Sequence, residues 1–164
     1  MSKLSLCLWF DEAAEEAARF YVETFQACGQ PAGLGDTMRY TEGSPRPAGS
    51  VLSVGFTLAG QDFIALNGGP HFTFTPAISL FVTCADQPEI DRFWEALLVG
   101  GSPQRCGWLT DRFGVSWQVV PARLGEMLRD PDRERAGRAM QAMLGMVKLD
   151  IAALEAAYAG GRAG

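Results

Sequence analysis

The sequence is short of the residues on which metal and nucleic-acid binding depend. It has one histidine, His71, in 164 residues, and its four cysteines form no C-x-x-C pair. Because zinc sites usually take closely spaced ligand pairs, we expect no structural zinc. We also expect no other metal and no cofactor. Fourteen basic residues face 19 acidic ones, for a net charge of −5. This balance argues against a nucleic-acid partner, which requires a basic face, and it disfavours anionic membranes.

Long apolar runs are also missing. No stretch approaches the roughly 20 apolar residues that span a bilayer, so no membrane partner is expected. The short apolar run at 4–10 is followed at once by Asp11 and Glu12, unlike a signal peptide, which has a cleavage site there. We therefore expect a cytoplasmic protein with reduced cysteines. Cys7 and Cys84 lie inside apolar runs and are expected to be buried.

The first half of the chain predicts a strand, a helix and further strands. Residues 4–10 form a buried-strand candidate, and alanines and aromatics then recur at helical spacing. Asp11 is expected to cap this helix, which should end near Gly29. Gly/Pro-rich sequence follows, and the later strands are expected at 37–41, 51–58 and 62–66, with a hairpin turn joining the last two.

The same pattern restarts in the second half. A strand is expected at 78–84, an amphipathic helix after Asp86, and two strands within 106–121 around a turn at 111–114. The repeat spacing is about 74 residues, which indicates an internal duplication. Asp150 is expected to cap a last helix after one that opens near Pro131.

These patterns predict an α+β fold in which two βαβββ modules form a cupped mixed sheet, followed by C-terminal helices. The chain length suits one domain with its own apolar core. We expect a single domain over residues 1–164, made of module one at 1–73, module two at 74–121 and a helical tail at 122–164.

Four segments carry a family resemblance, namely CLWFDEAAEEAARFY, PAGSVLSVGFTLAGQDFIALNGGPHFTF, CGWLTDRFGVSWQVVP and DPDRERAGRAMQAMLGMVKLDIAALEAA. Together they resemble the PhnB-like branch of the vicinal-oxygen-chelate (glyoxalase/bleomycin resistance/dioxygenase) superfamily. Members of this branch often carry the name 3-demethylubiquinone-9 3-methyltransferase. The resemblance extends to about Ala157, and it implies a glyoxalase-like cup and a homodimer.

Metal-using members of the superfamily take His and Glu ligands from the first and last strands of each module. The resemblance places these positions at Leu4 or Leu6, Leu66 or Asn67, Ile78 or Ser79, and Gln118. None is a histidine or a carboxylate, whereas a divalent metal normally needs three or four good donors. The comparison therefore predicts no metal ligands in this chain.

The methyltransferase name finds no support in the sequence. A typical methyl-donor site has a glycine-rich turn between a parallel strand and a helix. No G-x-G-x-x-G occurs, and the NGGP segment at 67–70 follows a predicted antiparallel hairpin.

Five residues are predicted to bind a ligand, while no catalytic residue is predicted: Trp9, Asn67, His71, Trp108 and Gln118. His71 suits a general base, although a loop histidine without catalytic partners is the alternative. Each tryptophan either lines a pocket or packs in the core. Strand alternation places Trp117 and Gln118 on opposite faces, and Gln118 offers one acceptor and two donors.

Three functions remain open, in this order of preference. The first is metal-free binding of an unknown small molecule in an apolar pocket. The second is an enzyme, either of the vicinal-oxygen-chelate type or a methyltransferase as the family name says. The third is a dimeric interaction protein with a vestigial site.

Overall fold

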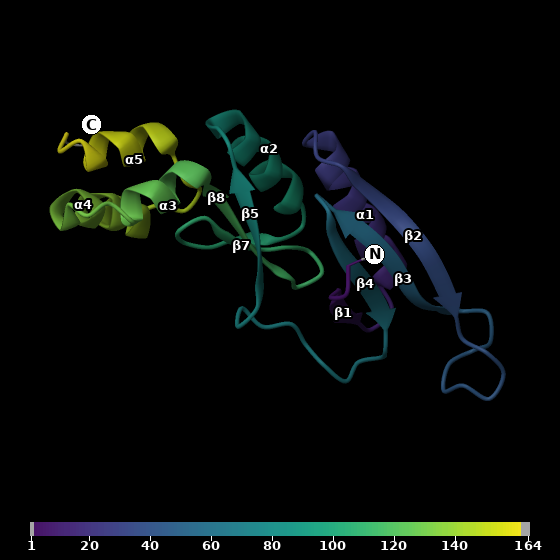
Figure 1. The fold of residues 1–164 in the computed structure, drawn as a ribbon. Helices are drawn as coiled ribbons and strands as arrows, with labels where there is room; N and C mark the ends of the chain where they lie inside the picture. The colour runs from purple at the N-terminus through teal and green to yellow at the C-terminus, as the bar shows by residue number, and fades with distance from the viewer. Residues whose placement is uncertain (1, 162–164) are drawn as a thin grey trace. The chain divides into compact units, whose positions relative to one another are not determined.

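The computed structural model describes residues 2–161, and the chain divides into two compact units, Met1–Phe74 and Thr75–Gly164 (Figure 1). Each unit holds one four-stranded sheet. Among residues 2–161 no helix has the length and apolar character needed to cross a membrane. That modules 1–73 and 74–121 and the tail 122–164 act as a single domain stays a prediction.

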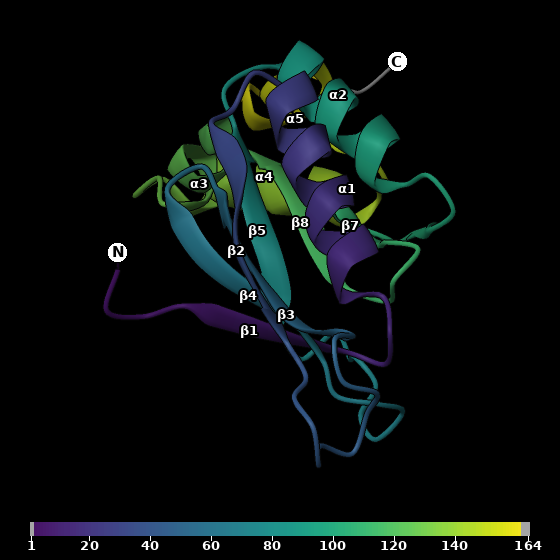
Figure 2. The same cartoon turned by 90° about the vertical axis from the view of Figure 1, so that its right-hand side faces the viewer.

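The first unit contains β1 (Leu6–Phe10), α1 (Ala14–Ala27), β2 (Ala32–Arg39), β3 (Val51–Leu58) and β4 (Gln61–Asn67). Its sheet has the order β1-β4-β3-β2, with β1 parallel to β4 and the other neighbours antiparallel. Helix α1 covers one face of this sheet (Figure 2). The strands and the helix form a βαβββ module, as the sequence predicts.

Strand alternation decides which side chains meet α1. Leu8 and Phe10 of β1 are buried, as are Phe63 and Ala65 of β4, whereas the residues between them are more exposed. Apolar side chains at every second position thus form the core with the apolar face of the helix. The other face of the sheet carries no helix of this unit.

The second unit repeats the arrangement and adds helices, in the order β5 (Ser79–Cys84), α2 (Gln87–Leu97), β6 (Ser102–Pro103), β7 (Trp108–Thr110), β8 (Ser116–Pro121), α3 (Ala122–Leu128), α4 (Arg133–Leu144) and α5 (Ile151–Tyr158). The sheet order β5-β8-β7-β6 matches that of the first unit strand for strand. The α+β fold with two βαβββ modules and C-terminal helices is therefore confirmed.

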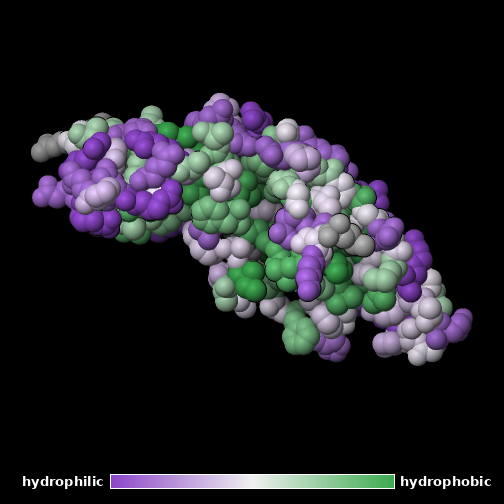
Figure 3. Space-filling model, viewed as in Figure 1, coloured by the Kyte–Doolittle hydropathy of each residue, from purple (hydrophilic) through white to green (hydrophobic). Residues whose placement is uncertain are grey.

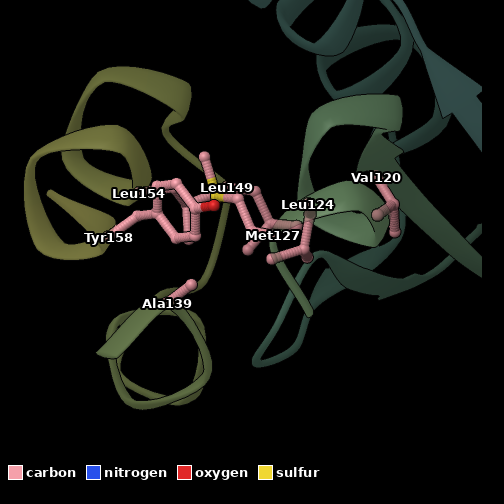
Figure 4. Close-up of a cluster of buried hydrophobic side chains, with 7 residues drawn as sticks. All are labelled: Val120, Leu124, Met127, Ala139, Leu149, Leu154 and Tyr158. Carbon is pink, nitrogen blue, oxygen red and sulfur yellow. The ribbon is translucent and has the colours of Figure 1, made fainter. Parts of the chain in front are cut away.

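The C-terminal helices have an apolar core of their own (Figure 4). Seven buried side chains from β8 to α5 form it, namely Val120, Leu124, Met127, Ala139, Leu149, Leu154 and Tyr158. Asp132 and Asp150 cap α4 and α5 by accepting hydrogen bonds from first-turn amides. Asp150 was predicted in this role, and α3 lies within the predicted helical tail at 122–164, although it was not predicted as a separate helix.

Three local predictions need correction. Asp11 does not cap α1, because the helix begins after Ala13 and Asp11 instead lies 3.4 Å from Arg46 in an ion pair. The strand expected at 37–41 is longer and starts at Ala32, since pairing with β3 overrides the weak strand preference of its glycines. Cys7 is exposed rather than buried, because alternation turns Leu8 toward α1.

Candidate functional site

A pocket of about 550 Å³ lies between the second sheet and the helices α3 and α4. Three of its lining residues are neighbours across strands, because Gln118 of β8 pairs with Phe81 of β5 and with Trp108 of β7. Directly paired residues point to the same face of a sheet. We call Phe81, Trp108 and Gln118 the pocket floor.

The floor occupies the face of the sheet that points away from α2. One residue earlier along β8, Trp117 is almost fully buried, and its indole N–H donates to the Asp111 carboxylate at 2.8 Å. Gln118 on the opposite face is only partly buried. The prediction that these two side chains lie on opposite faces of the sheet is therefore confirmed, and Trp117 belongs to the core.

The side-chain amide of Gln118 is the polar group of the pocket floor. Its Nε2 donates to the hydroxyl oxygen of Ser79 at 2.9 Å, which leaves Oε1 as a hydrogen-bond acceptor. No residue within 2–161 donates to that oxygen. The floor thus offers two aromatic surfaces and one open hydrogen-bond acceptor.

The opposite wall comes from the helical tail. Leu124, Gly125 and Leu128 of α3 line the pocket together with Met143 of α4. They reach it because α3 begins at Ala122, directly after β8, so the chain folds back over the sheet that it has just left. This wall was not predicted from the sequence, although the apolar residues at 124, 127 and 128 have helical spacing.

Two charged residues, Glu126 and Arg129, also line the pocket. Glu126 is neutralised by Arg123, whose Nη1 lies 3.0 Å from the Glu126 carboxylate. Arg123 also bonds Glu155 at 2.6 Å, and these two hydrogen-bonded carboxylates raise the pKa of Arg123 above its usual value. Within the described part of the chain, the Arg129 side chain has no hydrogen-bonding or ion-pair partner.

The other three predicted site residues lie in the first unit. The Trp9 indole N–H donates to the Gly69 carbonyl at 3.0 Å, and the Trp9 ring meets His71 edge-on at 6.5 Å between centroids. Phe72 lies 4.9 Å from the same ring. The structure thus brings Trp9 and His71 together, while Trp108 and Gln118 meet in the second unit.

Asn67 is engaged within the first unit. Its Oδ1 accepts from the Ala14 amide at 2.9 Å, and its Nδ2 donates to the Val51 carbonyl at 3.2 Å. The side chain is buried, so both ends of its amide serve the fold. Its role in ligand binding stays a prediction, as do those of Trp9 and His71.

The described residues offer no cluster of metal ligands. Nowhere in residues 2–161 do three His, Cys, Asp or Glu side chains gather in a way that could hold a metal ion. Of the four ligand-like positions, which are Leu4 or Leu6, Leu66 or Asn67, Ile78 or Ser79, and Gln118, it is Gln118 that faces the pocket. The donor set on the floor is therefore one neutral amide, a weak ligand for a divalent ion.

Comparison with known proteins decides the family. The sequence profile of the 3-demethylubiquinone-9 3-methyltransferase family matches residues 2–120. The chain belongs to this family. A PhnB protein from Bacillus cereus, which carries the family's methyltransferase name provisionally, is 36% identical, with a TM-score of 0.65 over 74% of this chain and 100% of its own. The predicted PhnB-like assignment is confirmed.

A second structure supports the family fold. Protein PA1353 from Pseudomonas aeruginosa is 23% identical, with a TM-score of 0.59 over 74% of this chain and 98% of its own. No curated protein matches the chain. The family match ends at residue 120, so the pocket floor lies inside the matched region, while the wall formed by α3 and α4 lies beyond it.

Proposed function

We propose that this PhnB-like protein binds a small, largely apolar molecule in the pocket of its second unit. The observation that carries the proposal is the pocket floor, where two aromatic side chains flank one amide with an open acceptor. The volume of about 550 Å³ falls within the range of roughly 300–1,000 Å³ typical of small-molecule sites.

The composition of the lining supports binding over catalysis. It contains no histidine, its one thiol is Cys106, and its one carboxylate, on Glu126, is held by Arg123. Nucleophilic catalysis needs a base beside the nucleophile, and metal catalysis needs several anionic or imidazole ligands. The lining offers apolar contact area and a hydrogen bond, which are the means of recognition.

The test is a fragment screen against the isotope-labelled full-length protein, read by nuclear magnetic resonance. We expect hits to shift the Gln118 side-chain amide and the Trp108 indole signal. Trp108→Ala should weaken the hits by about tenfold or more, because it removes a large aromatic contact. Phe113→Ala, an aromatic change outside the pocket lining, serves as the control. The absence of hits, or hits indifferent to Trp108→Ala, would contradict the proposal.

We also propose that the protein is a cytoplasmic homodimer. The helix-free face of the first sheet is apolar: Met38 is 57% exposed, and Trp9 and Leu66 are half-buried on the same face. Figure 3 shows apolar surface gathered over the strands of this unit. Such a surface favours a second copy as its cover. Four free cysteines fit a reducing compartment.

Sedimentation velocity tests the dimer. At micromolar concentration the wild-type protein should sediment with a mass of twice 17.7 kDa. Met38→Glu should shift it toward the monomer, while Glu42→Gln, an exposed change in the loop after β2, should not. A wild-type protein that is monomeric throughout this range would rule the dimer out.

A further inference from the structure

We infer that the pocket selects a small carboxylic acid, with its apolar body on the pocket floor and its carboxylate paired with Arg129. The inference rests on the proposed binding function and adds the chemical class of the ligand. It follows from the charges at the pocket, from the placement of the Arg129 guanidinium and from the open acceptor on Gln118.

The charges at the pocket favour an anionic ligand. Of the two charged side chains in the lining, Glu126 is paired with Arg123 at 3.0 Å, and Arg123 is itself held by Glu155 at 2.6 Å. Arg129 has no such partner within residues 2–161. The pocket therefore presents one uncompensated positive charge beside apolar walls, and an anionic group on the ligand would neutralise it.

The Arg129 guanidinium lies close to Gly125. A Cβ atom on Gly125 would lie 3.1 Å from Nη1 of Arg129, so the guanidinium folds back against α3 at a residue that itself lines the pocket. The backbone beneath is fixed, because the Arg129 amide bonds the Gly125 carbonyl at 3.2 Å. Arginine offers a planar pair of donors that matches a carboxylate.

Gln118 favours a second polar group on the ligand. Because its Nε2 is committed to Ser79, its Oε1 is left to accept a hydrogen bond. A hydroxyl on the apolar body would donate to it, whereas a hydrocarbon would leave it unsatisfied, at a cost in affinity. A hydroxylated aromatic acid meets all three features of the pocket.

The experiment compares matched acids and amides, beginning with 4-hydroxyphenylacetate and 4-hydroxyphenylacetamide, which differ only in charge and in one polar atom. Calorimetry should show the acids binding wild-type protein about tenfold more tightly, as expected for one charge-assisted pair. Arg129→Gln should remove this preference, because it should weaken acid binding far more than amide binding. Arg92→Gln, an exposed arginine on α2 outside the pocket lining, should keep it.

Gly125→Ala provides a second variant, which should fold because alanine favours helix. Its methyl group would crowd the guanidinium, which would have to shift by a few tenths of an ångström, and should reduce the preference for acids. Equal binding of acids and amides by wild-type protein, or a preference that survives Arg129→Gln, overturns the inference while the binding function stands. If no acid, amide or screened fragment shifts Gln118, the binding function itself fails.

Discussion

The side-chain oxygen of Asn67 accepts a hydrogen bond from the main-chain amide of Ala14, with 2.9 Å between the two atoms. Ala14 is the first residue of α1, and the preceding Ala13 provides no capping side chain. The last residue of β4 thus satisfies a helix amide that the local sequence leaves free. This bond ties the helix to the sheet across 53 residues of chain.

Asn67→Ala should therefore destabilise the protein by about 1–3 kcal/mol, since it leaves a buried amide without its acceptor. Urea unfolding measures the change. Gln61→Ala at the exposed start of the same strand is the matched control and should cost less than about 0.5 kcal/mol. Equal effects of the two variants would show that the cap contributes nothing.

Gly68 makes room for Trp9. A Cβ atom at position 68 would lie 2.1 Å from the Trp9 ring, far inside contact distance. Gly68→Ala should displace the indole, break its bond to Gly69 and lower the stability by about 1–3 kcal/mol. Gly33→Ala, where the added Cβ meets nothing within 4 Å, controls for the loss of glycine. Equal midpoints of thermal unfolding for the two variants would contradict this steric explanation.

The acid stability of the helical tail should depend on Tyr158. Its hydroxyl donates to Asp130, and this bond is the main reason that the Asp130 pKa lies below its usual value. A lowered pKa in the folded state stabilises the protein above the unfolded value of about 3.9, and the contribution is lost as pH falls through the folded value.

Tyr158→Phe keeps the ring that Arg135 covers at 4.2 Å but removes the hydroxyl. The variant should be less stable than wild type at neutral pH. The difference should shrink as pH falls below about 4, because Asp130 of the unfolded chain takes up a proton before Asp130 of the folded protein does. Unfolding curves from neutral to acid pH test this. If the difference in free energy of unfolding between the two proteins stays constant across this pH range, then Asp130 is not the titrating group responsible.

Gly137 offers a stabilising change. It lies inside α4, has no positive φ, and a Cβ there meets nothing within 4 Å. Gly137→Ala should raise the free energy of unfolding by about 0.5–1 kcal/mol, because alanine restricts the unfolded chain and favours helix. A drop in the midpoint of urea unfolding would contradict this expectation.

The sequence predicted two of the three residues of the pocket floor, Trp108 and Gln118, but not the pocket. Alternation along β8 separates Trp117 from Gln118 without any knowledge of the fold, and the CGWL segment identifies Trp108. Phe81 was missed because an apolar strand residue looks the same on either face until its neighbours are known. Arg129 was missed because an unpaired arginine can be recognised only after the partners of the others are known.

Sequence reasoning alone predicted the two βαβββ repeats, the turns at Ala59-Gly60 and at Asp111, and the Asp150 cap. These depend on residues a few positions apart, and side-chain periodicity and turn chemistry act at that range. Only the tertiary structure decided that Asn67 caps α1, that Cys7 is exposed, and that α3 closes a pocket over Gln118. Such relationships join residues distant in the chain, and packing selects them among many partners of equal local preference.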